Sequence, residues 1–181
     1  MKKIIVLIYV LVRISMNASA QEDSSFNSNI SLGFHLMQIQ QDFGLGINLT
    51  SPHFAKNTIA LRMRGNLMWN QHLDNTNNST WTSYSNLSLG VFGVGGEIND
   101  FIRLYGEGGL LVLFPSGEFS SESSVFGGYG LLGFEFLMND ASNYFLEIGG
   151  TGTGATADEI LGNPIYSNGL IISVGYRYMF R

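Results

Sequence analysis

The stretch Phe43-Gly44-Leu45-Gly46-Ile47-Asn48-Leu49-Thr50 places a large apolar residue at every odd position and a small or polar residue at almost every even one. Successive side chains of a strand point to opposite faces of its sheet, so this alternation predicts a strand with one apolar face. Seven further segments show the same period of two. We therefore expect strands near residues 29–39, 43–50, 57–69, 82–94, 101–113, 125–138, 144–155 and 168–180.

The segments between these strands are alternately short and long. Residues 51–56, 95–100 and 139–143 are short, residues 70–81, 114–124 and 156–167 are longer, and the first hairpin at 40–42 is tight. This alternation is typical of membrane β-barrels, which have short turns on one side of the membrane and longer loops on the other. The sequence predicts an all-β protein, a transmembrane antiparallel up-and-down barrel of about eight strands over residues 29–181.

Charged residues within the predicted strands all fall on the side opposite the large apolar residues. These residues are Arg62, Arg64, Arg103, Glu107, Glu135, Glu147 and Arg177. A water-soluble barrel such as a lipocalin has the reverse arrangement, with charge outside. We therefore expect lipid outside and a structural network of ion pairs inside. Together with Tyr105 and Tyr129 these side chains fill a lumen of eight strands, so a general diffusion pore is not expected.

The spacing of the hairpins predicts which charges meet, because residues paired across a symmetric loop have numbers that sum to twice its midpoint. A midpoint at 119 pairs Arg103 with Glu135, and a midpoint near 162 pairs Glu147 with Arg177. The same reasoning places Arg62 and Glu107 on either side of Ser88. We expect all three pairs to be structural.

The N-terminus has the pattern of a secretory signal. Lys2 and Lys3 precede the apolar run 4–12, and the small residues 18–20 lead into Gln21. We expect a signal peptide over 1–20, cleaved near Ala20/Gln21, and a short periplasmic tail over 21–28. The chain has no cysteine, which excludes disulfides and lipoprotein acylation.

The C-terminus carries the most specific motif, Ser173-Val174-Gly175-Tyr176-Arg177-Tyr178-Met179-Phe180. It resembles the assembly signal that ends outer-membrane proteins, with Ser173, Gly175, Tyr178 and Phe180 at the matching positions; Arg181 departs from the pattern, which usually ends on the aromatic residue. Over the whole mature sequence the chain resembles the OmpA/OmpX-type family of small eight-stranded outer-membrane barrels. The resemblance implies insertion into the cell outer membrane of a Gram-negative envelope by the assembly machinery, as a monomer.

The expected function is structural or surface-interacting, through the external loops 70–81, 114–124 and 156–167. Lipid and lipopolysaccharide are the expected surroundings, and the acidic balance argues against nucleic acid. No residue pattern predicts a catalytic site, a cofactor or a metal site. Two alternatives stay open: a lipid A hydrolase or acyltransferase at the external rim, which would use His72 or its neighbours, and a narrow route for small hydrophobic solutes, which would require a gap in the wall.

Overall fold

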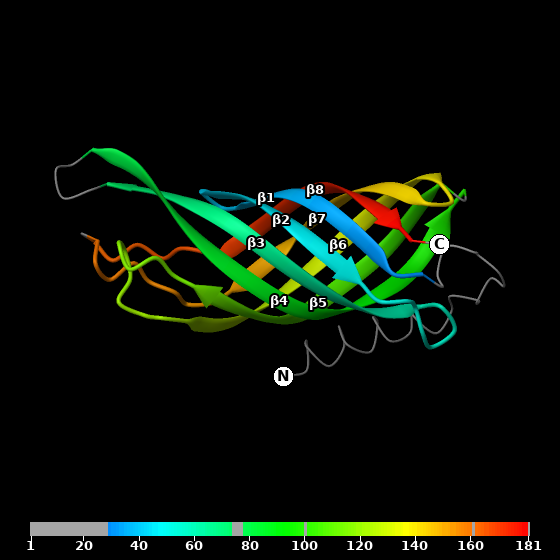
Figure 1. Cartoon of the computed structure of the whole chain (residues 1–181), viewed down its shortest axis with the longest axis horizontal. Helices are drawn as coiled ribbons and strands as arrows, with labels where there is room; N and C mark the ends of the chain where they lie inside the picture. Colours follow the sequence, from blue (N-terminus) through cyan, green and yellow to red (C-terminus); the bar gives the residue numbers. More distant parts are fainter. Residues whose placement is uncertain (1–28, 74–77, 100, 161, 181) are drawn as a thin grey trace, which may run out of the picture.

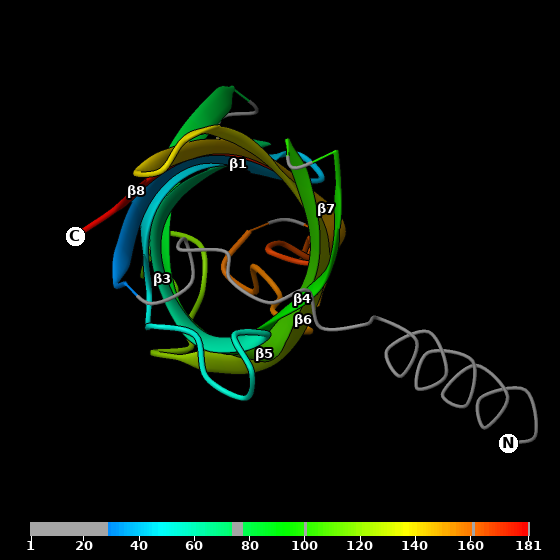
Figure 2. The ribbon, with the colours of Figure 1, turned by 90° about the vertical axis from the view of Figure 1, so that its right-hand side faces the viewer.

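The computed structural model describes residues 29–73, 78–99, 101–160 and 162–180. They form a closed barrel of eight antiparallel strands in which each strand pairs with its sequence neighbours and β1 pairs with β8 (Figures 1 and 2). The strands are β1 (Ser31–Ile39), β2 (Asp42–Thr50), β3 (Ile59–Leu73), β4 (Ser79–Ile98), β5 (Ile102–Phe114), β6 (Val125–Asn139), β7 (Ser142–Gly152) and β8 (Gly169–Met179). Within the described residues, no helix is long and apolar enough to cross a membrane.

The sequence prediction of the fold class is confirmed, and most strand bounds lie within a few residues of those expected. The predicted signal peptide 1–20 and tail 21–28 lie outside the described residues. We use the name terminal end for the side of the barrel where the described chain begins, at residue 29, and finishes, at residue 180. The opposite end, with the turn 40–41 and the loops after β3, β5 and β7, is called the loop end (Figure 1).

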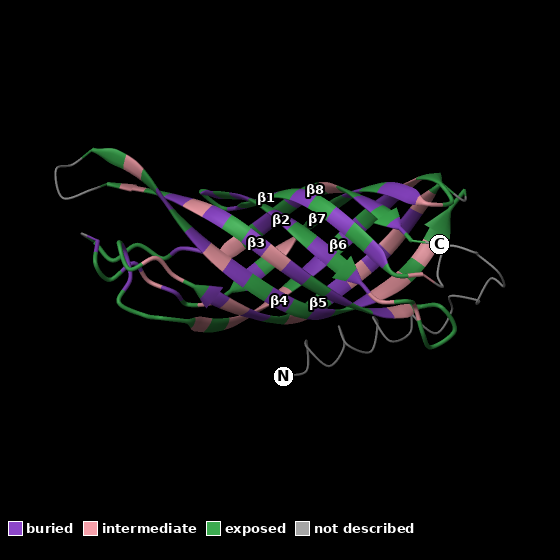
Figure 3. Cartoon of the chain, viewed as in Figure 1, coloured by how far each residue is buried: buried purple, intermediate pink, exposed green. Residues whose placement is uncertain are grey.

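Buried and exposed residues alternate along the strands (Figure 3), as expected when successive side chains point to the inside of the barrel and to its outer surface. In β2 every even residue from Asp42 to Thr50 is buried and every odd one is exposed. The outer surface carries large apolar groups, for example Ile47, Leu89 and Leu110. The wall therefore presents a continuous apolar surface outward, which in water would be strongly unfavourable.

The strands differ in length, so the rim is uneven. β1 and β2 have 9 residues each, whereas β3 has 15 and β4 has 20. The last β2–β3 pair is Phe43 with Trp69, and the β4–β5 ladder begins at Ser85 with Phe114. Above these points β3 and β4 pair only with each other, as far as Leu73 with Ser79. We call residues 70–73 and 79–84 the ribbon; it stands above the rim at the loop end (Figure 1).

Candidate functional site

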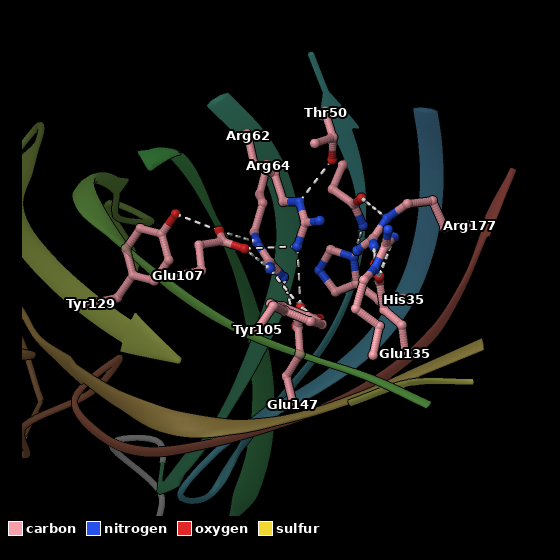
Figure 4. A network of polar contacts seen from close by, with 12 residues as sticks. His35, Thr50, Arg62, Arg64, Tyr105, Glu107, Tyr129, Glu135, Glu147 and Arg177 are labelled. Atoms are coloured by element: carbon pink, nitrogen blue, oxygen red, sulfur yellow. Dashed lines mark hydrogen bonds and ion pairs between the residues drawn. The ribbon is translucent and has the colours of Figure 1, made fainter. Parts of the chain in front are cut away.

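The middle of the lumen contains a buried cluster of charges centred on Arg64 (Figure 4). Its guanidinium donates to Glu107 through Nε at 2.8 Å and Nη2 at 2.5 Å, and to Glu147 through Nη1 at 2.8 Å and Nη2 at 2.7 Å. All three side chains are almost fully buried. Arg64 thus connects β3 to β5 and to β7 across the lumen, and charge-assisted bonds of this kind are the strong ones.

Arg62 completes this cluster from the next inward position of β3. Its Nη1 donates to Glu107 at 2.8 Å and its Nε to Thr50 at 2.8 Å, while Glu147 lies 3.6 Å from Nη1. The guanidinium also lies over the ring of Phe92, 4.1 Å from its centroid. Two arginines and two glutamates therefore share one buried network whose charges balance, as burial requires.

Two tyrosines cap the carboxylates. Tyr105 donates to Glu147 at 2.5 Å, and Tyr129 donates to Glu107 at 2.7 Å. The inner wall carries a glycine next to each tyrosine ring. A Cβ on Gly133 would overlap Tyr105, and a Cβ on Gly90 would overlap Tyr129. These glycines therefore leave room for the aromatic rings that fill the barrel.

A second cluster lies closer to the terminal end. Arg103 donates to Glu135 through Nε at 2.6 Å, and Arg177 pairs with the same carboxylate. The Arg177 guanidinium lies over Phe145, 4.6 Å from the ring centroid. Arg103 and Glu135 are direct cross-strand partners in the β5–β6 ladder, the register that the midpoint at 119 predicts.

Of the other two predicted pairings, that of Glu147 with Arg177 is wrong, whereas the ion pair of Arg62 with Glu107 is present. Glu147 lies opposite Ser173, and Arg177 lies opposite Asn143, so Glu147 and Arg177 do not face each other. The reason is that β7 ends at Gly152, before the expected end at 155, which moves the midpoint of the hairpin from about 162 to 160 and the β7–β8 register by four residues. Arg62 and Glu107 do form the expected ion pair inside the lumen, although Ser88 lies opposite Arg64 and Leu111 and not between them.

His35 belongs to a neutral chain of hydrogen bonds beside the ion pairs. Its Nε2 lies 2.7 Å from Asn66 Oδ1, and Asn48 Nδ2 lies 3.3 Å from its Nδ1. Asn66 donates in turn to Asn86 at 2.7 Å. These contacts suit a neutral imidazole with its proton on Nε2, so His35 acts as a buried hydrogen-bonding group. Position 35 shares the parity of the buried residues of β1, so the alternation alone places this side chain inside the barrel. The alternation does not predict its hydrogen-bond partners.

Towards the loop end the lumen becomes apolar, which the sequence did not predict. Loop residues Phe119, Ile160 and Tyr166 pack with inward side chains of the wall such as Met68 and Leu113. The rings of Phe119 and Tyr166 are 4.8 Å apart in an edge-on arrangement. The remaining cavity between this cluster and Arg64 has a volume of about 20 Å³, close to the room one water needs. The loops after β5 and β7 therefore fold into the mouth of the barrel.

Asp42 fixes this closed arrangement. Its buried carboxylate accepts hydrogen bonds from Asn70 Nδ2 at 2.6 Å, Tyr84 Oη at 2.5 Å and the backbone N–H of Ser167 at 2.9 Å. A second link joins the two loops, because Asp158 accepts hydrogen bonds from the N–H and the hydroxyl of Ser121. These bonds hold the pKa of the Asp158 carboxyl below its usual value. The mouth is therefore held by specific polar contacts as well as by apolar packing.

Among the described residues around His72, the structure shows packing and local hydrogen bonds and no carboxylate bonded to the imidazole. Its ring packs against Phe119 at 6.0 Å between centroids, and its Nδ1 is buried without a hydrogen-bond partner among the described residues. Ser79 accepts a hydrogen bond from Gln71 at 2.7 Å. Asp74, the remaining candidate, lies outside the described residues. His53 packs edge-on against Phe92 at the terminal end.

The C-terminal motif lies in β8 with its polar and aromatic positions on opposite faces. Ser173 and Gly175 face the lumen, where a Cβ on Gly175 would overlap Phe145 and the backbone of Phe34. Tyr178 and Phe180 point outward with their rings edge-on, 5.5 Å apart. This is a complete amphipathic final strand, and its role as an assembly signal stays a prediction.

A closed eight-stranded barrel with charges inside and apolar groups outside is the fold of the small outer-membrane barrels. Neither a protein-family model nor a curated protein sequence matches the chain. Among solved structures it is similar to the N-terminal β-barrel domain of Pseudomonas aeruginosa OprF, with a TM-score of 0.59 and 10% identity over 85% of this chain and 98% of that one.

Two further structures share this fold. The E. coli outer membrane protein W has a TM-score of 0.53 and 9% identity, over 87% of this chain and 100% of that one. The Yersinia pestis outer membrane protein Ail in a phospholipid bilayer nanodisc has a TM-score of 0.51 and 14% identity, over 84% of this chain and 99% of that one. At these identities the likeness concerns the fold alone.

Proposed function

We propose that this chain is an integral outer-membrane protein that acts at the cell surface as an interaction protein, through its loop end, and not as a general pore. The loop end is then extracellular and the terminal end periplasmic. The inside-out distribution of charge supports the membrane location, since an arginine facing the middle of a bilayer costs roughly 2–4 kcal/mol in a barrel wall.

The ribbon is the observation that carries the interaction role. Beyond Trp69 on β3 and before Ser85 on β4, each strand has a partner on one side only. Unpaired strand edges are ready templates for another extended chain, and most proteins cover or shorten them. Here the ribbon extends beyond the rim of the barrel (Figure 1), and its inward side chains Asn70 and Tyr84 hold its base by hydrogen bonds to Asp42. An edge of this kind suits a partner that adds an extended segment by main-chain hydrogen bonds.

Side chains of the ribbon fit the same role. Trp81 and Leu73 are 53% and 54% exposed although they lie above the apolar wall. Exposed aromatic groups are frequent anchors of interfaces. The exposed neighbours Gln71, Ser79 and Ser83 offer hydrogen bonds without charge. The backbone edges would supply affinity and these side chains selectivity.

The closed lumen argues against a general pore. The two charge clusters cross the middle of the barrel, and the loops after β5 and β7 fill its mouth. The route for small hydrophobic solutes would need an opening in the wall, whereas each described strand is hydrogen-bonded to both neighbours in a closed barrel. The lipid A enzyme would need a catalytic group near His72. The described neighbours of His72 are the ring of Phe119, which packs against it, and the hydroxyl residue Thr80 on the opposite strand.

The test shortens the ribbon without changing the barrel. Residues 72–80 are replaced by Asn-Gly, which joins the directly opposed Gln71 and Trp81 by a two-residue hairpin turn. Peptides are selected from a displayed random library on the purified wild-type barrel. We expect extended peptides whose affinity falls at least about tenfold on the shortened variant, with no change on the control Asp140→Asn at the opposite end.

The outcome that contradicts the proposal is equal binding of the selected peptides to the wild type and to the shortened barrel. Both variants must first show the heat-dependent change in gel mobility of a folded barrel. Contacts with lipopolysaccharide and with the assembly machinery remain part of the proposal, and neither depends on the ribbon.

A further inference from the structure

A groove runs along the outer wall near the terminal end. It has a volume of about 270 Å³ and is lined mainly by Ile30, Leu49, Leu61, Met63 and Leu89, with Pro52 at its end. Leu49, Met63 and Leu89 are successive cross-strand neighbours on β2, β3 and β4, so the groove crosses three strands. Its lining is apolar and outward-facing, which suits a hydrocarbon chain.

The turn that closes this groove has an unusual backbone. Ser51 and Pro52 line the groove and begin the β2–β3 turn, in which Ala55, Lys56 and Asn57 have φ values of 50°, 62° and 61°. Three consecutive non-glycine residues in the left-handed region are costly and persist only where their surroundings impose them. The N–H of Phe54 donates to Ile59 at 2.7 Å and the Thr58 hydroxyl to Ala55 at 2.6 Å.

Charge is the reason to assign an occupant to the groove. The arginines of the described residues are enclosed in the lumen, so Lys56 is the single lysine or arginine that the described part of the chain exposes. Other exposed ionisable groups at this end, Glu97 and Asp140, are acidic. Among the described residues at the terminal end, Lys56 is therefore the group that attracts an anion, whereas Glu97 and Asp140 repel one.

We propose that the groove and Lys56 form a binding site for one anionic glycerophospholipid, with an acyl chain in the groove and the phosphate at Lys56. The proposal rests on the membrane location proposed above, which places this end in the phospholipid leaflet on the periplasmic side. Basic residues next to the hydrocarbon region bind anionic headgroups in this way. Lys56 lies on the same turn as Ser51 and Pro52, which line the end of the groove, so a headgroup at this turn and an acyl chain in the groove belong to one lipid.

The experiment is native mass spectrometry of the folded barrel, released from detergent after exchange into equimolar dioleoylphosphatidylglycerol and dioleoylphosphatidylcholine. We expect the wild type to retain one phosphatidylglycerol in preference to phosphatidylcholine. Lys56→Gln should reduce this preference about fivefold, the effect of one juxtamembrane charge, and Lys56→Arg should keep it. Met63→Trp, which fills the groove, should remove the bound lipid, and Val174→Trp on the outer face of β8 should not.

Three results overturn the proposal: no lipid retained by the folded wild type, an unchanged preference in Lys56→Gln, or equal lipid retention by Met63→Trp and Val174→Trp. Lys56→Gln changes an exposed turn and leaves the wall intact, so the second result does not depend on the folding of the tryptophan variants. Each sample is first checked for its heat-dependent gel shift. If the wild type lacked this shift, the membrane function itself would fail; a folded wild type without retained lipid refutes only the lipid site.

Discussion

Replacing Arg64 with methionine tests the lumenal network most severely. The side chain is 1% exposed and its guanidinium makes four hydrogen bonds of 2.5–2.8 Å to Glu107 and Glu147. Methionine keeps much of the volume but leaves an uncompensated buried carboxylate, since Arg62 alone must then serve both glutamates. Breaking a buried pair on one side costs about 3–5 kcal/mol. We therefore expect Arg64→Met to lower the free energy of unfolding by this amount.

The same reasoning predicts rescue by a second change. In Arg64→Met combined with Glu147→Gln, one cation and one anion are removed together, and the Arg62–Glu107 pair at 2.8 Å remains. The loss of unfolding free energy in the double variant should be smaller than the sum of the losses in the two single variants by at least about 2 kcal/mol, because the partners are in direct contact. The lipid-facing change Leu61→Met serves as control and should cost less than about 0.5 kcal/mol.

The assay is urea unfolding of each barrel in phospholipid vesicles, followed by tryptophan fluorescence and checked by gel mobility. Trp69 and Trp81 are the only tryptophans of the chain, and both lie towards the loop end of the β3–β4 hairpin. A loss of less than about 1 kcal/mol in Arg64→Met, or strict additivity in the double variant, would refute the view that these charges depend on one another.

Further predictions concern the mouth, the loops, the glycines and the lumen. Asp42→Asn should make the long loop after β7 cleavable by added protease while the barrel stays folded; a loop as resistant as in the wild type contradicts the role of this carboxylate. Ser121→Ala should raise the pKa of Asp158 towards its ordinary value, measured by NMR titration. Because the folded pKa is lowered, the wild-type link between the loops persists above the ordinary pKa and is lost only as the pH falls through the lowered one. Gly149→Ala should prevent folding, since its Cβ would overlap the backbone of Gly130, whereas Gly130→Ala, with its nearest neighbour 4.0 Å away, should fold normally; equal yields of both would contradict this packing. Planar-bilayer recordings should show no steady porin-sized conductance, and a large open level would contradict the filled lumen.

The strands and their inner faces could be predicted from sequence because one signal, the period of two, determines both. The charges of the lumen all share the parity opposite to the large apolar groups, so their side of the wall followed directly. The pairing of Arg103 with Glu135 followed as well, because the loop between β5 and β6 is symmetric about 119. A symmetric loop transmits the register across a hairpin, and local pattern is then enough.

Features that depend on folded loops could not be predicted in this way. The register of β7 and β8 differs by four residues from the expected one because β7 ends at Gly152, where the segment 153–168 leaves the wall and forms its own bridge between Thr156 and Ile165. The available signal for the filled mouth was the presence of apolar residues such as Phe119 and Ile160 in otherwise polar loops. Such residues indicate burial only when the fold already shows a barrel opening that they can fill. The ribbon was predicted as the loop 70–81, because Asn, Ser and Thr resemble loop composition when no apolar face is present.

The most direct test of the inside-out barrel is the accessibility of nitroxide labels on β2. The chain has no cysteine, so single cysteines can be labelled at Leu45, Ile47 and Leu49, which point outward, and at Asn48, which points into the lumen. In vesicles we predict high collision rates with oxygen and low rates with a water-soluble nickel chelate at the three outer sites, and low rates with both at Asn48. Nickel collisions as frequent as those with oxygen at the outer sites would show a wall that faces water, and would contradict the membrane barrel.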